Sequence, residues 1–302
     1  MIDSLVHTPK SEAECALRLY DESWCAAYAV RLRWPQGFVC PVCAASHQGY
    51  VQSEKPLCRA CGRSSSITAG TLLHGSKKSI ATWLRALWWL SGEHTSVSIA
   101  KLKHHLGFRS YQTGWAWMKK LRFILHQVNR TQCRGIVLVD AVAADDCDKG
   151  DQLLTSVESI ARGRSTGRLR IKVSAVLNQE FIAQFCRQAV TPGSIIIVPG
   201  RTPFDGFHMQ EIVCTVDDSI FHHEDVLRIS ACYRLWRRQK KFRCTAQHSD
   251  QDLVDEFCYF YNRSLYTDRV HLFETLVSVA LTHSHDDFRS LIEQSAAPGG
   301  VQ

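Results

Sequence analysis

The sequence lacks a long apolar run. No stretch approaches the ~20 consecutive apolar residues that a transmembrane helix needs, and no apolar segment follows a basic N-terminus as in a signal peptide. Internal repeats and low-complexity tracts are also missing, apart from a tail rich in Ala, Pro and Gly at residues 295–302. These absences predict a cytoplasmic protein without a membrane partner. The length of 302 residues indicates about two domains.

Acidic residues are almost absent between Leu72 and Arg134. This segment holds eleven Lys and Arg residues against one acid, Glu93, a net charge of +10, whereas the whole chain carries +7. A segment of that charge is suited to neutralising phosphates, so we expect it to bind double-stranded DNA and to associate with the nucleoid. A solvated helical hairpin with charged outer faces is the alternative, but it does not explain the lack of acids.

The thirteen cysteines lack the spacing of a disulfide framework. Only four are paired, as Cys40-Pro-Val-Cys43 and Cys58-Arg-Ala-Cys61. An odd total in a chain without a secretory signal indicates a reducing compartment and metal binding. Two CxxC turns supply the four thiolates that zinc favours in closed structural sites, so we expect one structural zinc ion per chain in a zinc ribbon.

The expected ribbon has short strands at residues 49–51 and 64–68. Two histidines nearby, His47 and His74, are expected at the surface, because the four thiolates already fill the metal shell. Two alternatives remain open. The four cysteines can be core residues that pair by chance, or one CxxC can be a redox motif, although no βαβ pattern surrounds either pair.

An apolar period close to 3.6 residues runs from Ser79 to Val128 and indicates helices. Helix, glycine turn and helix of this size are typical of a helix-turn-helix, with base readout expected from Arg109 and Gln112. The expected elements are a helix over residues 80–90 ended by Gly92, a helix over residues 97–106 with Ser96 as its N-cap, a turn at Gly107 and a helix over residues 111–128. The candidate DNA contacts are Lys101, Lys103, Arg109, Gln112, Lys119, Lys120 and Arg122.

From Gly135 onward, short apolar runs typical of strands replace the helical pattern. Asp140 directly follows the run Ile136–Val139, and a carboxylate at a strand end is how many nucleases hold catalytic metal. Three strands, a helix, another strand and further helices are the order of an RNase H-like fold. The expected strands are 136–139, 153–158, 169–177 and 194–198. The expected helices are 179–188, 225–242, 251–262 and 270–281, with one more over residues 12–32.

Several sequence blocks resemble one family. They are the first CxxC with CRACGRSSSITAGT, then GTLLHGSKKSIATWLRALWWL, LTSVESIARGRSTGRLRIKV, TPGSIIIV and DEFCYFYNRS. From about Phe38 to Leu281 the chain is similar to bacterial insertion-sequence transposases that carry an N-terminal zinc ribbon and a DDE-type nuclease domain. The resemblance implies a multidomain α+β protein. Its implied parts are a zinc ribbon (36–70), a helix-turn-helix region (71–130) and an α/β RNase H-like domain (134–290). Outside the resemblance we expect an N-terminal helical segment (1–35) and a loose tail (291–302).

The resemblance also implies a particular metal chemistry. These transposases cut and join DNA with two divalent ions held by three side chains: an Asp ending the first strand, an Asp after a later strand, and a Glu or Asn on a C-terminal helix. Asp140 matches the first position. Pro199 and Cys232 stand at the second and third, and neither offers the oxygen that magnesium needs. We therefore predict that Asp140 is vestigial and that the chain binds DNA without cutting it.

Two other functions remain open. An active transposase, with magnesium as cofactor, needs a rebuilt metal site, whereas the acids Asp145, Asp146 and Asp148 are expected in a solvated turn. A zinc-ribbon adaptor that binds protein is the third hypothesis, and the basic segments disfavour it. A homodimer is an assembly that the sequence allows. Candidates for rebuilding the metal site are Asp205, Glu224 and Asp225. Further candidate DNA contacts, with a solvated helix face as the alternative, are Arg237, Arg238, Lys240 and Lys241.

Overall fold

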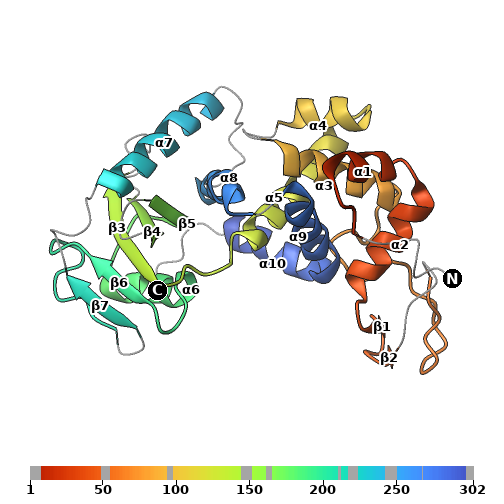
Figure 1. The fold of residues 1–302 in the computed structure, drawn as a ribbon, viewed down its shortest axis with the longest axis horizontal. Coiled ribbons are helices and arrows are strands. Elements are labelled where there is room, and N and C mark those ends of the chain that lie inside the picture. The colour runs from red at the N-terminus through yellow and green to blue at the C-terminus, as the bar shows by residue number, and fades with distance from the viewer. Residues whose placement is uncertain are drawn as a thin grey trace. The chain divides into compact units, whose positions relative to one another are not determined.

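The computed structural model is mixed α+β and describes most of the chain (Figure 1). The chain folds into two compact units. Met1–Ile124 with Tyr266–Gln302 form the first unit, and Leu125–Leu265 form the second. The division falls within one long helix, α5 (Tyr111–Val128). The described residues are 8–48, 55–93, 98–143, 152–160, 165–209, 212–216, 224–241, 250–266 and 268–296.

Two helices begin the first unit, α1 (Glu12–Arg18) and α2 (Glu22–Arg33). The single helix expected over residues 12–32 is wrong, because Asp21 starts a new helix. Its carboxylate accepts a hydrogen bond from the backbone N–H of Trp24 at 3.1 Å, which satisfies one of the unpaired donors at the start of α2. A short polar residue inside an apolar pattern is therefore a helix boundary here.

The next helices lie where the apolar period places them. They are α3 (Ile80–Gly92), α4 (Ile99–Leu106) and α5. Trp83 of α3 stacks on Trp117 of α5 with ring centroids 3.4 Å apart. Both rings are buried, so this stack joins the two helices in the core of the first unit.

A glycine makes the turn between α4 and α5. Gly107 lies where the turn was predicted, and its backbone is left-handed with φ of 65°. Ser98 is the N-cap of α4, whereas Ser96, the expected cap, lies outside the described residues. Gly114 lets α5 approach α4, because a Cβ at that position would lie 2.9 Å from the side chain of Ile99. The two helices therefore cross closely.

The ribbon segment holds one short antiparallel pair, β1 (Gly37–Val39) and β2 (Ser46–Gln48). The strand expected at residues 49–51 lies outside the described residues. The prediction of a strand at residues 64–68 is wrong. The only β-pairing of these five residues is an isolated bridge from Ser64 to Leu57.

An arginine explains why residues 64–68 form no strand. The Arg33 guanidinium donates hydrogen bonds to the backbone carbonyls of Ser66, Ile67 and Ala69. These carbonyls are therefore taken by a side chain rather than by a neighbouring strand. Burial lowers the pKa of Arg33 to about 10, as expected for a cation drawn into the protein.

The C-terminal helices α9 (Arg269–Thr282) and α10 (His285–Ala296) belong to the first unit. The sequence assigns residues 266–290 to the domain 134–290, but in the structure they pack with the N-terminal helices. The sequence did not predict α10, which includes the first residues of the segment 291–302 expected as a loose tail.

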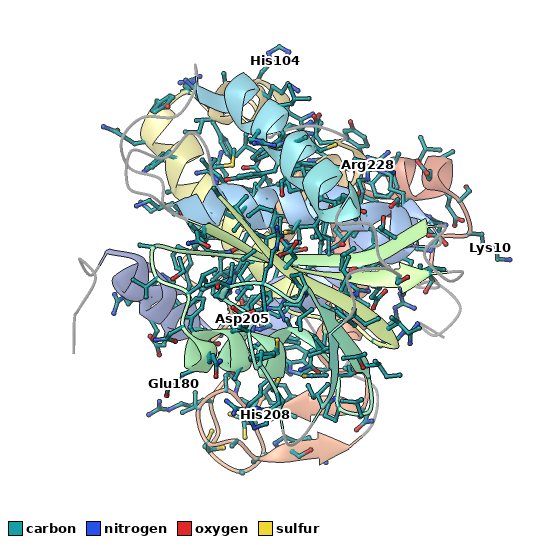
Figure 2. All side chains as sticks on the ribbon, turned by 90° about the vertical axis from the view of Figure 1, so that its left-hand side faces the viewer. Lys10, His104, Glu180, Asp205, His208 and Arg228 are labelled. Atoms are coloured by element: carbon teal, nitrogen blue, oxygen red, sulfur yellow. The ribbon has the colours of Figure 1, made fainter. Side chains whose placement is uncertain are left out.

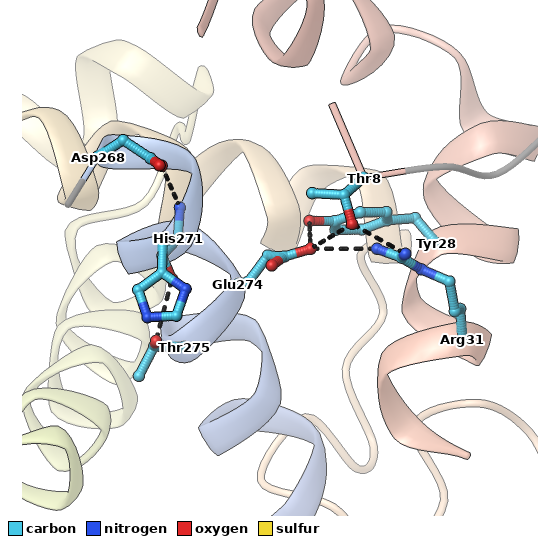
Figure 3. Close-up of polar contacts among 7 residues, drawn as sticks. All are labelled: Thr8, Tyr28, Arg31, Asp268, His271, Glu274 and Thr275. Atoms are coloured by element: carbon cyan, nitrogen blue, oxygen red, sulfur yellow. Dashed lines mark hydrogen bonds and ion pairs between the residues drawn. The ribbon is translucent and has the colours of Figure 1, made fainter. Parts of the chain in front are cut away.

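A polar cluster ties α9 to the N-terminal helices (Figure 3). Glu274 of α9 accepts hydrogen bonds from the Tyr28 hydroxyl and the Arg31 guanidinium, both at 3.1 Å, and from the Thr8 hydroxyl at 3.2 Å. Tyr28 is fully buried. Its hydroxyl therefore needs a partner, and the Glu274 carboxylate supplies one.

The second unit is built on a five-stranded sheet in the order β5-β4-β3-β6-β7. The strands β3, β4 and β5 are antiparallel neighbours, whereas β6 runs parallel to β3 and β7 runs parallel to β6. The four predicted strands are present, and β7 was not predicted. The strands are β3 (Ile136–Ala143), β4 (Gln152–Ile160), β5 (Ser165–Ser174), β6 (Ile195–Val198) and β7 (Val213–Val216).

Helices cover both faces of this sheet, as the unbroken apolar run of β3 requires. Val137 and Val139 belong to a core cluster with α6, and Leu138 belongs to another with α7 and α8. Asp140 comes two residues after Leu138, so it lies on the face that α7 and α8 cover. The helices are α6 (Gln179–Ala189), α7 (Glu224–Lys241) and α8 (Asp250–Asn262), all close to their predicted positions.

Candidate functional site

Two tight turns in the first unit bring the four paired cysteines together. In the first turn the backbone N–H of Ala44 donates to the carbonyl of Cys40 at 2.9 Å. In the second turn the N–H of Gly62 donates to the carbonyl of Cys58 at 2.8 Å. Both turn residues have a left-handed backbone, with φ of 58° at Ala44 and 69° at Gly62. The same local turn is therefore built twice, as the repeated CxxC spacing predicts.

The sulfur atoms have the spacing of a tetrahedral metal shell. The Sγ–Sγ distance is 3.8 Å between Cys40 and Cys61 and 3.6 Å between Cys43 and Cys58. All four sulfurs lie within 4.8 Å of one another. Tetrahedral zinc with Zn–S bonds of ~2.3 Å separates its sulfurs by ~3.8 Å. The four cysteines can therefore hold one zinc ion.

The pKa values of the cluster thiols shift in opposite directions, because that of Cys43 is raised while that of Cys58 is lowered. The backbone N–H of Cys61 and the side chain of His47 lower the pKa of the Cys58 thiol from 9.0 to about 5, which favours the thiolate that binds metal. The surface position expected for His47 is wrong. Its ring is half-buried, stacks on Phe38 and lies 3.3 Å through Nε2 from Cys58 Sγ. His74 is exposed, as predicted.

In the second unit, Asp140 is buried and paired with an arginine. The Arg201 nitrogen Nη2 donates to both carboxylate oxygens of Asp140, at 2.9 and 2.8 Å, and the backbone N–H of Ala141 donates to Oδ1 at 2.7 Å. The side chain of Asp140 is 4% exposed, whereas that of Arg201 is 47% exposed. Asp140 does not end its strand, because β3 continues to Ala143.

The residues at the two other expected ligand positions offer nothing to a hard metal ion. Pro199 directly follows Val198, the last residue of β6, and β6 lies beside β3. Proline carries no side-chain donor atom for a metal. Cys232 lies in α7 with an exposed side chain, whereas Ile229 and Tyr233 form the face of α7 that packs on the sheet. The structure therefore turns Cys232 away from the packed face.

The described residues contain no group of carboxylates that could rebuild a magnesium site. Among them, only the four cysteines form a set of three or more His, Cys, Asp or Glu side chains close enough to share an ion. Asp205, labelled beside α6 in Figure 2, is exposed and accepts a hydrogen bond from the Thr202 hydroxyl at 2.9 Å. The side chains of Glu224, Asp225, Asp145, Asp146 and Asp148 lie outside the described residues.

The candidate DNA contacts of the helical hairpin differ in exposure. Arg109, Gln112 and Lys119 are exposed. Lys101 is also exposed and forms an ion pair with Glu93 at 3.3 Å. These residues lie at the start of α4, in the turn before α5 and along α5. Lys103 and Arg122 are half-buried. The side chains of Arg237, Arg238, Lys240 and Lys241 in α7 lie outside the described residues.

Lys120 is turned inward, which disfavours it as a phosphate contact. Its Nζ donates to the backbone carbonyl of Leu72 at 2.6 Å and lies 5.8 Å from the ring centroid of Trp83. Burial lowers the pKa of Lys120. Because its apolar stem and its charge both have partners inside the first unit, Lys120 supports the packing of α5 rather than a surface.

Sequence reasoning missed three site residues: Arg201, His47 and Arg33. The signal for Arg201 was its place two residues after Pro199, where a basic side chain stands next to an expected acidic site. The signal for His47 was its place between two CxxC turns. Arg33 carried no such signal, because its partners are backbone carbonyls.

No helix among the described residues is long and apolar enough to cross a membrane. Comparison of the chain with protein-family models, with curated proteins and with solved structures gives no match.

Proposed function

We propose that this chain is a DNA-binding protein descended from zinc-ribbon DDE transposases of insertion sequences, and that it no longer cuts or joins DNA. One observation carries the proposal. Asp140, where the resemblance implies a magnesium ligand, is buried against Arg201, while Pro199 takes the place of the second ligand on the neighbouring strand. The acid expected at the first ligand position is present, but the metal ion expected there would lack its other ligands.

The sheet supports the proposed descent. Three antiparallel strands, then a helix, then two strands parallel to the first give the order β5-β4-β3-β6-β7 with β3 at the centre. The order along the chain, three strands, a helix and a further strand, is the one expected of an RNase H-like fold, and the resemblance implies a catalytic carboxylate at the first strand. Asp140 lies on that strand.

The hairpin of α4 and α5 supports DNA binding. A helix-turn-helix places the N-terminal part of its second helix in the major groove. Arg109 and Gln112 stand at that point and are exposed, and both side chains suit base edges or phosphates. Lys119 is exposed further along α5. The four-cysteine cluster adds the zinc ribbon that the resemblance places before this hairpin.

Neighbouring lysines on α5 give a matched test of DNA binding. Binding of the full chain to mixed-sequence duplex DNA is measured by fluorescence anisotropy over a range of salt concentrations. We expect Lys119→Gln to weaken binding and to reduce the slope of log K against log[salt] by about 0.9, the effect of one lost phosphate contact. Lys120→Gln should leave the slope unchanged, because that charge already has internal partners.

Two outcomes of the binding experiment would contradict the proposal. One is the absence of salt-dependent binding, which would favour the adaptor that binds protein. The other is an equal reduction of the salt slope in both variants, which would contradict the assignment of Lys119, but not Lys120, to a DNA-facing side of α5.

A second experiment tests the loss of catalysis. A plasmid that carries the ends flanking the gene is incubated with the protein and Mg²⁺ or Mn²⁺. We expect neither nicking nor strand transfer, because two of the three ligand positions hold Pro199 and Cys232. Strand transfer that Asp140→Ala abolishes would show instead an active transposase with a rearranged metal site.

A further inference from the structure

We infer that the Arg201 guanidinium supplies at Asp140 the positive charge that a divalent ion would supply in a metal-dependent nuclease. The buried carboxylate of this protein therefore needs no magnesium ion. The inference rests on the proposed descent only for the identity of the metal that is replaced. The ion pair itself is a property of the described residues.

The geometry fills the coordination space of the carboxylate. One nitrogen of Arg201 lies within 2.9 Å of both oxygens of Asp140, the position from which a metal ion would also approach a carboxylate. The backbone N–H of Ala141 takes a further bond to Oδ1. A magnesium ion would have to displace the guanidinium to reach these oxygens.

Burial explains why a replacement charge is needed. A carboxylate that is 4% exposed has lost most of its water and is costly unless a cation compensates it. Guanidinium stays charged at all ordinary pH values and is weakly hydrated, so it enters such a site readily. Magnesium gives up its waters reluctantly and prefers near-octahedral oxygen ligands. Pro199 provides none of these oxygens beside Asp140.

The two residues are therefore retained as a pair. Without Arg201, Asp140 would be a buried carboxylate that has lost its guanidinium partner. Arg201 follows β6, the strand that lies parallel to β3, and this adjacency lets its side chain reach Asp140. Persistence of the acid then reflects its new structural partner rather than a surviving reaction.

Thermal unfolding of four full-length variants tests the pair. They are Arg201→Gln, Arg201→Lys, Asp140→Asn and the double variant Arg201→Gln/Asp140→Asn. At neutral pH we expect Arg201→Gln to lower the Tm by about 5 °C or more, because it leaves a buried charge without its partner. Arg201→Lys should keep most of the Tm, since it preserves the charge. The double variant should be more stable than Arg201→Gln, because a neutral amide needs no cation.

Manganese provides the second measurement, with NaCl at equal ionic strength as its control. We expect Mn²⁺ to leave the Tm of the wild type unchanged, because the guanidinium already contacts both oxygens of Asp140. A Mn²⁺-dependent rise in the wild type that Asp140→Asn abolishes would overturn the inference. So would equal Tm losses in Arg201→Gln and in the double variant.

Neither measurement involves DNA. Failure of the inference would therefore leave the DNA-binding test intact, and loss of DNA binding would leave the ion pair untouched.

Discussion

At the residue scale, the two cysteine turns differ in one respect that can be measured. Ala44 and Gly62 hold the same left-handed backbone, which costs an L-residue roughly 1–2 kcal/mol and costs glycine little. No atom lies within 4 Å of a Cβ added at Gly62, so only backbone strain would oppose an alanine there. We expect Gly62→Ala to destabilise the zinc-loaded protein by roughly 1 kcal/mol.

The reciprocal change, Ala44→Gly, serves as the matched variant. It removes the strain but makes the unfolded chain more flexible, which costs about 0.4–1 kcal/mol. We therefore expect it to be neutral or slightly stabilising. Chemical denaturation of both variants in the presence of excess zinc measures the difference. A loss in Ala44→Gly as large as that in Gly62→Ala would mean that the two turns are not equivalent.

The contact between His47 and Cys58 gives a testable prediction about the pH dependence of metal binding. Protons compete with zinc for the thiolates, so the lowered pKa of Cys58 keeps this ligand ready to bind metal at neutral pH. We expect His47→Phe to raise that pKa by removing the contact to Cys58 Sγ. Zinc release, followed with a coloured chelator, should then begin at a higher pH.

His74→Phe is the control for this experiment, because His74 is exposed and, in the described structure, makes no bond to the cluster sulfurs. Its release curve should match that of the wild type. Identical release curves for His47→Phe and the wild type would show that His47 does not influence zinc release.

At the scale of the element, α8 covers the open edge of the sheet. The Asn262 side chain bonds the N–H and the carbonyl of Leu169, both at 2.8 Å. Gln251, three helical turns earlier, bonds the N–H of Val173 and the carbonyl of Ile171. The two amides thus satisfy backbone groups of β5 that would otherwise offer a template for another strand.

We expect Asn262→Ala to destabilise the second unit by roughly 2–3 kcal/mol, since it leaves a buried donor and acceptor of the backbone without partners. Hydrogen exchange should become faster at Leu169, and Gln251→Ala should have the same effect at Val173. Gln184→Ala on the exposed side of α6 is the control and should change neither amide. Unchanged exchange at Leu169 in Asn262→Ala would contradict the assigned role.

At the scale of the whole molecule, metal removal should affect the two units unequally. The cysteine cluster belongs to the first unit, and the sheet has its own core clusters. We expect a chelator to increase hydrogen exchange in residues 37–72 and to leave β3, β4 and β6 protected, because zinc binding is coupled to folding only where its ligands lie. Loss of protection throughout the sheet would show instead that the molecule unfolds as one cooperative unit.

The parts of this molecule that sequence reasoning could predict are those with local causes. The CxxC turns, the glycine turn at Gly107 and the apolar run of β3 each carry their signal within a few residues, and the structure contains all three. The four-cysteine cluster follows from two local turns that bring their sulfurs within reach of one ion. Local spacing was therefore enough for the metal site.

The missed features have distant partners. The strand expected at residues 64–68 is absent because Arg33, about thirty residues earlier, occupies its carbonyls. The pairing of Arg201 with Asp140 depends on β6 lying beside β3, which no short pattern encodes. Asp21 carries an N-cap signal that marks the boundary between α1 and α2. The apolar period continues on both sides of it, so the sequence indicated one helix.

The ion pair on the central strand also bears on the proposed descent from a metal-dependent nuclease. Pro199→Asp would place a second carboxylate two residues from Arg201, and the guanidinium could bind both. Loss of Arg201 first would leave the buried Asp140 uncompensated, so that intermediate would pass through a less stable protein. Under the proposed descent, the ion pair would therefore oppose the return of a metal site by single substitutions.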